Sequence, residues 1–385
     1  MSIATPEAEA GLTPAQVEAR ERIYAAPLET LDPANEDAFP TGEMFWKFER
    51  LRREDPVHFT PAEHTEFGHY WSLTKWDDIQ AADTNFGAFS AEGIIPLAKP
   101  VAPEDRRPIL DAETLSEAEA EAADAGGIRS LLSMDPPEHE IHRGAVAEGV
   151  SPANLRAMEP LIRERAGKIL DGLPIGEEFD WVDKVSIELT SMTLATLFDF
   201  PQEQRRTLTF WSNVITSPSG PGMPTETLDE RQAAMRDFFE TFTDMFHRRR
   251  SEDQRLDFVS LLAHSPHAKD FTDGELLGDG IVLLVGGNDT TRNTISGSVY
   301  ALNKYPSENA KLRANPALIP SMVSETIRWQ TPLTHMARRT TRDVEMGGKV
   351  IPKGDRVAMW FVSGNRDEDK IENADAYIID RKNPR

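Results

Sequence analysis

Apolar residues recur every three to four positions through most of the chain, which is the spacing of helices that bury one face. In residues 41–54 they fall at Met44, Phe45, Phe48 and Leu51. The same spacing predicts further helices at 137–150, 152–173, 181–200, 203–215, 226–250, 307–314 and 318–329. We therefore expect a mainly α protein.

Alternation of polar and apolar residues predicts a small β part built from both ends of the chain. Residues 57–59 and 69–73 are expected to form a hairpin. Residues 334–362 alternate in the same way and contain two glycine turns. The β part is therefore expected to bring together strands that are far apart in the sequence.

No linker or internal repeat divides the sequence after its first forty residues. Residues 1–40 are polar and rich in Ala, Pro and Glu, so we expect a mobile lead-in with little structure beyond a short helix. Residues 41–385 are expected to form one large domain. Two irregular stretches lie within it, at 89–127 and 217–226. The first has the length of a functional loop or lid, although its acidic tract fits a solvated insertion equally well.

Composition narrows the functions that such a fold can serve. The net charge of −23 argues against nucleic acid as the main partner, because phosphate binding relies on an excess of Lys and Arg. No stretch reaches the roughly eighteen apolar residues that span a bilayer. The first residues lack the features of a secretion signal, so a cytoplasmic location is expected. The sequence has no cysteine, which excludes disulfides, thiolate zinc sites and cysteine nucleophiles.

The longest apolar helix pattern, at residues 277–302, is interrupted at its centre. Thr272 and Glu275 form a capping box before it, and the apolar run then breaks at Gly286-Gly287-Asn288-Asp289-Thr290-Thr291. These six residues are poor helix formers, and each glycine costs about 1 kcal/mol relative to alanine. A core helix weakened in this way usually has a functional reason.

Three further stretches are unusual. An Asp-Pro-Pro sequence sets a helix start that places His139 and Arg143 on one face, where two cationic groups suit an anion. Glu325 and Arg328 are neighbours on a predicted helix and lie among apolar residues. The third stretch is Asn365-Arg366-Asp367. Each of these alone is most often an ordinary surface pair or turn.

In this order, these stretches resemble the motifs of the cytochrome P450 haem monooxygenases, over residues 41–385. The six central residues are similar to the oxygen-binding helix motif of that family. Glu325-x-x-Arg328 is similar to its E-x-x-R motif, and Tyr377-x-x-x-Arg381 to the segment whose arginine joins that pair. The resemblance implies one large triangular domain, mainly α with a small β part. It also implies an enzyme that uses haem b and O2.

The resemblance assigns cofactor-binding roles to residues of three motifs. His139, Arg143 and Arg338 would hold the haem propionates through charge-assisted hydrogen bonds. Gly286 and Gly287 would let the helix backbone approach the haem face, where a side chain would collide.

The resemblance also assigns catalytic and structural roles. Asp289 and Thr290 would deliver the protons needed for O–O cleavage, with the Thr290 hydroxyl bonded back to the carbonyl of Gly286. The ordinary alternatives are a satisfied helix hydroxyl for Thr290 and a surface ion pair for Asp289. The implied structural residues are Glu325, Arg328 and Arg381.

The iron ligand of this family is a cysteine thiolate in a glycine-rich loop. In the family, this loop follows the segment that ends here at Arg385. Because the chain has no cysteine, we expect the sequence to be partial and the fold to be incomplete at its C-terminus. No metal ligand is then expected in this chain, and the activity is expected of the complete protein.

Residues 286–293, 330–336 and 359–368 are similar to the bacterial branch that hydroxylates the terminal carbons of alkanes and fatty acids. The resemblance implies a narrow apolar channel, whose entry the two irregular stretches would gate. Its expected walls are Leu283, Gly286, Leu333 and Met336. A ferredoxin and its reductase would supply the electrons.

Two alternatives stay open. One is a non-catalytic relative that binds haem or an apolar ligand, and the other is a family member that acts on a different hydrophobic substrate, such as a terpenoid or steroid. A helical terpenoid synthase is rejected, because its Asn-Asp motif needs Ser or Thr and then Glu at four-residue steps. This chain has Arg292 and Ser296 at those positions.

Overall fold

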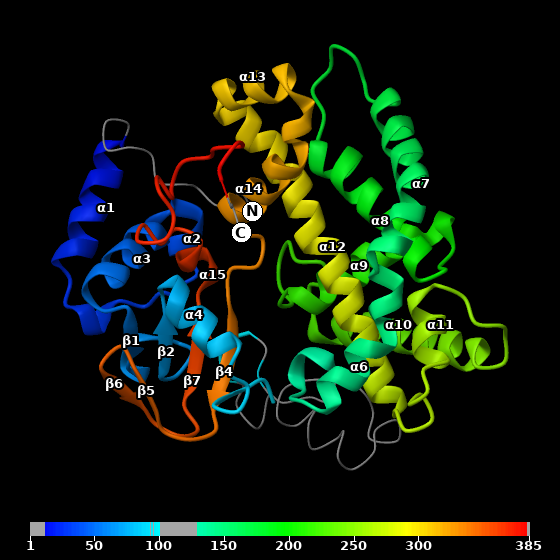
Figure 1. Cartoon of the computed structure of the whole chain (residues 1–385), viewed down its shortest axis with the longest axis horizontal. Coiled ribbons are helices and arrows are strands. Elements are labelled where there is room, and N and C mark those ends of the chain that lie inside the picture. Colours follow the sequence, from blue (N-terminus) through cyan, green and yellow to red (C-terminus); the bar gives the residue numbers. More distant parts are fainter. Residues whose placement is uncertain (1–11, 93, 95, 101–128, 383–385) are drawn as a thin grey trace. The chain divides into compact units, whose positions relative to one another are not determined.

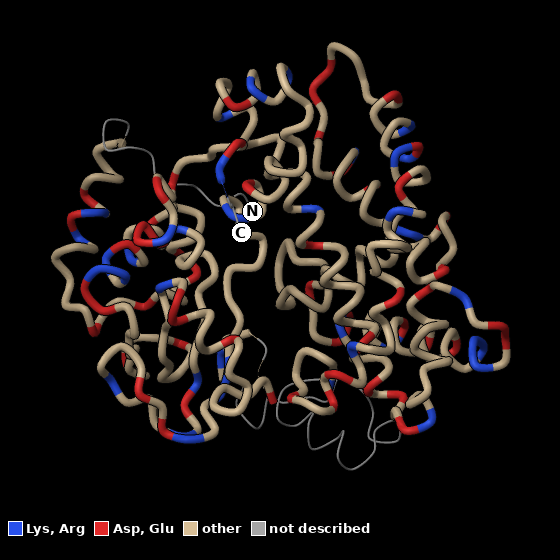
Figure 2. Tube along the Cα trace, in the orientation of Figure 1, with Lys and Arg blue, Asp and Glu red and all other residues tan. Residues whose placement is uncertain are grey.

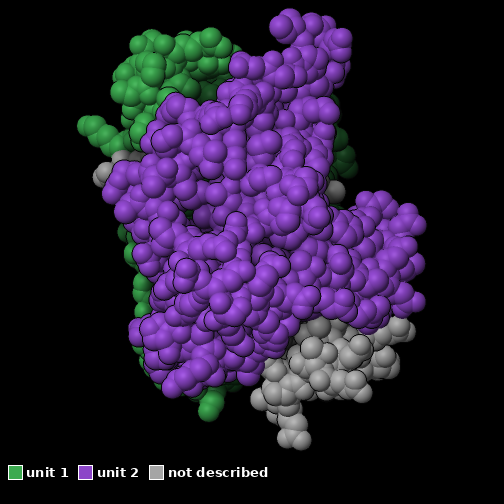
Figure 3. Space-filling view, turned by 90° about the vertical axis from the view of Figure 1, so that its right-hand side faces the viewer, with its two compact units in different colours: residues 1–102, 297–385 green, residues 103–296 purple. Residues whose placement is uncertain are grey.

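The structure is a computed structural model and describes residues 12–92, 94, 96–100 and 129–382. The chain divides into two compact units (Figure 3). Unit 1 comprises residues 1–102 and 297–385, and unit 2 comprises residues 103–296. The boundary falls inside helix α12 (Asp273–Lys304), which is continuous. The sequence predicted one undivided domain, and a division inside a helix leaves no linker to recognise.

Unit 1 contains the β structure, in which strands from both ends of the chain pair as predicted (Figure 1). Its strands are β1 (Val57–Thr60), β2 (Tyr70–Leu73), β3 (Phe89–Ser90), β4 (Met336–Thr340), β5 (Val344–Met346), β6 (Lys349–Ile351) and β7 (Arg356–Met359). Five of them form a sheet in the order β1-β2-β7-β4-β3, and β5 pairs with β6. β2 runs parallel to β7, with Ser72 opposite Ala358, and the other pairs are antiparallel.

The helices of unit 1 come from both ends of the chain, as its strands do. They are α1 (Pro14–Ala25), α2 (Ala38–Thr41), α3 (Glu43–Glu54), α4 (Trp76–Asp83), α13 (Pro306–Ala314), α14 (Ile319–Gln330) and α15 (Phe361–Gly364), with short turns η2 (Leu28–Thr30), η3 (Ala62–His64) and η9 (Pro316–Leu318). The helices predicted at 41–54, 307–314 and 318–329 are confirmed.

The lead-in predicted for residues 1–40 holds more structure than expected. Ile23 and Leu31 are buried against Trp46 in a small core, although the segment as a whole is polar. Arg50 Nη1 donates to the carbonyl of Ile23 at 2.6 Å. A few correctly spaced apolar residues and one buried arginine therefore fix the described part of this segment, which average composition did not reveal.

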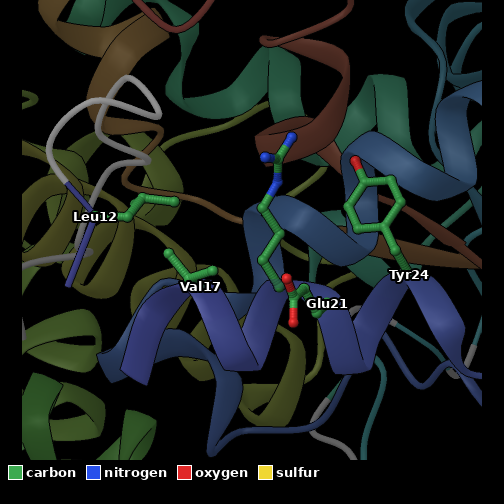
Figure 4. Close-up of a pocket in the computed structure, with 5 residues that line it drawn as sticks. Leu12, Val17, Glu21 and Tyr24 are labelled. Carbon is green, nitrogen blue, oxygen red and sulfur yellow. The ribbon is translucent and has the colours of Figure 1, made fainter. Parts of the chain in front are cut away.

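A surface hollow of about 410 Å³ lies along α1 (Figure 4). It is lined by Leu12, Val17, Arg20, Glu21 and Tyr24. The Tyr24 hydroxyl has a pKa raised to about 12 by burial and by the nearby negative charge of Glu49. None of the motif residues lines this hollow, so it is separate from the candidate site.

Unit 2 contains helices and no strand among its described residues. Its elements are η5 (Leu131–Ser133), α6 (Glu138–Val146), η6 (Ala147–Val150), α7 (Pro152–Asp171), the π-helical η7 (Val182–Ile187), α8 (Glu188–Leu197), η8 (Gln202–Gln204), α9 (Arg205–Thr216), α10 (Leu228–Arg249), α11 (Phe258–Ala263) and the first part of α12. The helices predicted between 137 and 250 are confirmed, with ends shifted by a few residues. α11 was not predicted.

Aromatic side chains from α9, α10 and Phe198, which follows the last residue of α8, form the centre of the unit 2 core. Phe242 lies with its ring centroid 5.3 Å from that of Phe198 and 4.4 Å from that of Phe238, and Trp211 packs edge-on against both α10 rings. This core explains why α10 carries phenylalanine at the spacing of a helical face.

The irregular stretches have different outcomes. Residues 217–226 contain no helix or strand, as predicted, and Gly222 adopts a φ of 77° that favours glycine. The acidic tract of the 89–127 stretch falls within residues 101–128, which lie outside the described part of the chain.

Charged residues of both signs follow the helices (Figure 2), and on α7 they form ion pairs such as Arg163 with Glu159. In the described ranges, no helix has the length and apolarity to cross a bilayer.

Candidate functional site

The centre of α12 stays helical through its six weak residues, and one of them bonds back along the helix. Thr290 Oγ1 donates to the carbonyl of Gly286 at 2.7 Å. This carbonyl therefore accepts a side-chain bond at the turn where glycine already weakens the helix. A Cβ added at Gly286 would meet nothing within 4 Å inside the described structure, so this side of the turn is open.

Gly287 has a packing role in unit 2 that was not predicted. A Cβ at this position would lie 2.6 Å from Cδ2 of Leu194, which is buried on α8. Gly287 therefore lets α12 pack closely against α8, and its missing side chain does not open the face that carries Gly286. The place of Gly287 at a haem face stays a prediction, and the close approach to Leu194 is an additional requirement for glycine that the sequence did not reveal.

Asp289 is held by two neighbours in unit 2. Its Oδ1 accepts from Arg292 Nη2 at 2.5 Å, one helical turn away, and its Oδ2 accepts from Thr216 Oγ1 of α9 at 3.3 Å. Arg292 also donates to Asn213 of α9 at 3.3 Å. The ion pair considered as the ordinary alternative for Asp289 is thus present. The carboxylate lies next to Thr290 in sequence, but it is anchored toward α9.

The two cationic residues predicted on α6 differ in their surroundings. His139 Nδ1 lies 2.7 Å from the carbonyl of Leu131, and because a carbonyl only accepts, Nδ1 carries the proton. Arg143 is exposed and has no ion-pair partner among the described residues. Both remain able to face an anion, His139 through Nε2 and Arg143 through its guanidinium.

Two buried residues that the sequence analysis did not single out lie beside them. Asp279 of α12 is fully buried, and its Oδ2 accepts from His142 Nδ1 of α6 at 2.6 Å. Its Oδ1 accepts from the backbone N–H of Leu131 at 2.8 Å. The His142 ring stacks on Phe271 at a centroid distance of 4.0 Å. A carboxylate within an otherwise apolar helix segment was the signal that could have identified this site.

In unit 1, Arg338 of β4 already has a carboxylate partner. Its Nη2 donates to Asp83 Oδ1 of α4 at 3.0 Å, and its Nη1 donates to the carbonyl of Ala337. Arg338, the third residue predicted to bind the propionates, is therefore already paired with Asp83. Its role at a haem stays a prediction, because His139 and Arg143 belong to unit 2.

The four predicted channel residues are also divided between the units. Leu283 of unit 2 is partly buried against the aromatic core, so part of its surface already serves the fold. In unit 1, Leu333 is 41% exposed and Met336 packs partly against the sheet core. The channel itself stays a prediction.

The Glu325, Arg328 and Arg381 contacts are present in unit 1. Glu325 is fully buried, and its two oxygens accept from Arg328 Nη2 and Nε at 2.8 Å each. Arg381 Nε donates to the same carboxylate at 3.2 Å. Arg328 also donates to the carbonyls of Asn365 and Ala374 at 2.8 and 2.6 Å. This group of charges ties α14 to two segments that follow α15.

His335, between two of the predicted channel residues, is a partly buried neutral histidine. Its Nε2 accepts from the N–H of Leu97 at 3.1 Å, so the proton sits on Nδ1, which lies 3.1 Å from Thr334 Oγ1. Burial lowers the pKa of His335 from its ordinary value of 6.5 to about 4. The ring also packs against Trp360. Sequence pattern alone did not identify this residue.

Comparison with known proteins gives consistent results. The Cytochrome P450 family model matches residues 184–384. Linalool 8-monooxygenase from Pseudomonas putida is 30% identical over 359 residues, which cover 92% of this chain and 84% of that protein. A methyl-branched lipid omega-hydroxylase from Mycobacterium bovis is 28% identical, over 88% of this chain and 76% of the relative.

The fold gives the same answer. The structure of cytochrome P450-153 from Novosphingobium aromaticivorans matches with a TM-score of 0.79 and 36% sequence identity, over 92% of this chain and 83% of that one. The motif residues in α12 and α14 thus lie in a chain that matches members of this family in both sequence and fold over most of its length. The chain therefore belongs to the cytochrome P450 family of haem-dependent monooxygenases.

Proposed function

We propose that this protein inserts one oxygen atom of O2 into a terminal C–H bond of a medium- or long-chain alkane or fatty acid. The observation that carries the oxygen chemistry is the bond from the Thr290 hydroxyl to the carbonyl of Gly286, next to Asp289. It places a polar group at the open turn of α12, directly after the apolar run of residues 281–285.

Haem b is the cofactor of the family, and the described residues offer groups that fit it. The open side of Gly286, where an added Cβ would meet no described atom within 4 Å, suits the approach of a flat ring system. Arg143 and the Nε2 atom of His139 suit carboxylates such as the haem propionates. The chain has no cysteine and so supplies no thiolate of its own. When bound, haem supplies the iron at which O2 is activated.

The proposed roles of the polar α12 residues follow from their atoms. The O–H of Thr290 donates to the carbonyl of Gly286, and its oxygen can still accept a hydrogen bond. The hydroxyl can therefore hold a water molecule at the open turn. Asp289 can exchange protons with solvent once its carboxylate turns away from Arg292. Together they would deliver protons to the oxygen side of the haem.

The substrate class is supported by similarity and by the proposed channel residues. The relative named as a lipid omega-hydroxylase favours attack at a chain end. Leu283, Gly286, Leu333 and Met336 are apolar or without a side chain, as a channel for a hydrocarbon requires. The relative named for linalool favours the alternative of a compact hydrophobic substrate such as a terpenoid.

The electron donor is proposed to be a ferredoxin with its reductase, as in the bacterial members that the sequence resembles. The acidic total charge of this chain means that an acidic donor would need a locally basic surface.

A product analysis tests the proposal. The haem-loaded protein, with a ferredoxin, its reductase and NADH, is incubated separately with octane, dodecanoic acid and linalool, and products are identified by mass spectrometry. Alcohols oxidised at the chain end support the proposal. Products oxidised only within the chain overturn the terminal selectivity. Turnover of linalool alone would favour the terpenoid alternative.

A further inference from the structure

A chain of hydrogen bonds in unit 2 connects α12 to the histidine proposed to bind a haem propionate. Asp279 accepts from His142 Nδ1 at 2.6 Å and from the N–H of Leu131 at 2.8 Å. The carbonyl of Leu131 then accepts from His139 Nδ1 at 2.7 Å. Leu131 is therefore fixed on both sides, its N–H by α12 and its carbonyl by α6.

A second contact holds the same segment to α12. Arg129 Nη1 donates to Glu275 Oε1 at 2.9 Å. Glu275 and Asp279 are four residues apart and so lie on the same face of α12. The segment that precedes α6 is thus attached to this face at two successive turns, and the Leu131 side chain is buried in the core.

The bond to Leu131 decides how His139 can meet a carboxylate. Because Nδ1–H is used by the carbonyl, Nε2 is the nitrogen that remains for a ligand. A carboxylate at Nε2 favours a proton there, and the ring then donates from both nitrogens as an imidazolium. The orientation of the Leu131 carbonyl thereby sets the direction in which His139 presents its charge.

Burial of the Asp279 carboxylate in the core is unfavourable by itself. A buried carboxylate costs free energy unless each oxygen is hydrogen-bonded, and an apolar side chain of similar size avoids that cost. Its neighbours Leu276 and Leu277 are buried and apolar. Core packing therefore does not explain why this position holds a carboxylate, whereas the bond to the N–H of Leu131 does.

We propose that Asp279 is a positioning residue for the cofactor: it fixes Leu131, whose carbonyl turns His139 so that Nε2 faces a haem propionate. This inference rests on the proposed function, because it needs His139 at a propionate. It also means that α12 carries both Asp279, which positions the propionate-binding histidine, and, about two turns later, Gly286 of the oxygen-side motif.

The test measures the rate at which haem leaves each variant for an excess of apomyoglobin. Asp279→Leu removes the acceptor for Leu131, and we expect about tenfold faster release, the factor of a hydrogen bond to a charged group. Asp279→Asn keeps an amide oxygen for the Leu131 N–H and should stay within about twofold of the parent. The matched control is Asp257→Leu, which removes another buried carboxylate of unit 2 that accepts a backbone N–H, from Ser260.

Two measurements separate positioning from a general loss of packing. In a His139→Ala background, Asp279→Leu should cause no further acceleration, because the two residues act through one bond. With haem dimethyl ester, which has no propionate charge, parent and Asp279→Leu should release at equal rates. If the leucine variant fails to fold, Asp279→Ser replaces it in the same measurements, because a serine side chain is too short to reach Leu131.

The outcomes distinguish this inference from the proposed function. Unchanged release in Asp279→Leu overturns the inference, and so does an acceleration that persists in the His139→Ala background or with the dimethyl ester. Equal acceleration by Asp279→Asn and Asp279→Leu assigns the effect to the pair with His142 and also overturns it. If His139→Ala itself leaves haem release unchanged, the assignment of His139 to a propionate fails instead.

Discussion

The carboxylate of Glu325 receives two parallel hydrogen bonds from Arg328, from Nε and Nη2, each 2.8 Å long. Both side chains are almost completely removed from solvent. A charge pair in this environment is compensated only while both members are present. Because Arg328 also binds the carbonyls of Asn365 and Ala374, the pair connects α14 to the last described part of the chain.

Loss of this pair should destabilise the protein strongly. We expect Glu325→Gln to lower the free energy of unfolding by about 3 to 5 kcal/mol, because it leaves the Arg328 charge buried without its partner. The measurement is urea unfolding followed by circular dichroism. Glu159→Gln is the matched control: its pair with Arg163 on α7 is 62% and 78% exposed, so a change of at most about 0.5 kcal/mol is expected. Equal effects in the two variants would contradict the assignment.

The two adjacent glycines of α12 should respond oppositely to alanine. Gly286→Ala adds a Cβ in open space, so better helix propensity should stabilise the protein without haem by up to about 1 kcal/mol. Gly287→Ala drives its Cβ into buried Leu194, and overpacking of this kind costs about 1 to 3 kcal/mol. Thermal unfolding of both variants measures the difference.

A shorter side chain on α8 provides the control for Gly287. Leu194→Val removes the atoms that the new Cβ would meet, so the double variant should be more stable than the two separate losses predict. Strict additivity would show that the overlap with Leu194 is not the cause.

His335 should make stability depend on pH. Its folded pKa of about 4 lies below the ordinary 6.5, so between these values the unfolded chain binds a proton that the folded chain does not. Stability is therefore full above pH 6.5 and falls as pH is lowered, with a total loss of about 3 kcal/mol below pH 4. Unfolding by urea across this range measures the slope.

Replacing His335 should weaken the dependence of stability on pH, and replacing an exposed histidine should not. His335→Gln keeps an acceptor for the N–H of Leu97 but does not titrate, so its slope between pH 6.5 and 4 should be shallower than that of the parent. His64→Gln, on the exposed η3 turn, should leave the slope unchanged. An unaltered slope in His335→Gln would show that other groups control acid unfolding.

Local relationships could be predicted from the sequence, and distant ones could not. The back-bond from Thr290 to Gly286 spans one helical turn, so helix periodicity together with residue type was sufficient. The packing requirement at Gly287 was not predicted, because it comes from Leu194 on another helix. The pair of His142 and Asp279 joins residues 137 positions apart, and no local pattern contains that information.

The same distinction applies to the fold. The apolar spacing of α10 identified its buried face, because a helix that packs on a core repeats every 3.6 residues. The described part of residues 1–40 was misjudged because a few contacts, such as Ile23 with Trp46, outweigh a polar average. Strand pairing was expected from both chain ends, but the parallel register of β2 with β7 required the structure.

Thr290 provides the most direct test of the oxygen chemistry. Thr290→Ala removes the hydroxyl that bonds to the carbonyl of Gly286, so proton delivery at the open turn should slow. General acid–base groups typically contribute a factor of about 10² to 10⁴, and we expect product formation to fall at least about tenfold. Reducing equivalents should then appear as hydrogen peroxide, measured with a peroxidase assay in the haem-loaded protein.

Two companion variants separate the hydroxyl from its helix. Thr290→Ser keeps a hydroxyl able to reach the same carbonyl and should retain most of the product yield. Thr294→Ala, one turn further along α12, removes a hydroxyl that donates to the carbonyl of Thr290 at 2.8 Å, so it perturbs the same helix without altering the open turn. Equal peroxide release from Thr290→Ala and Thr294→Ala would mean that general weakening of α12 causes the uncoupling, because only the first variant lacks the proposed proton-handling group.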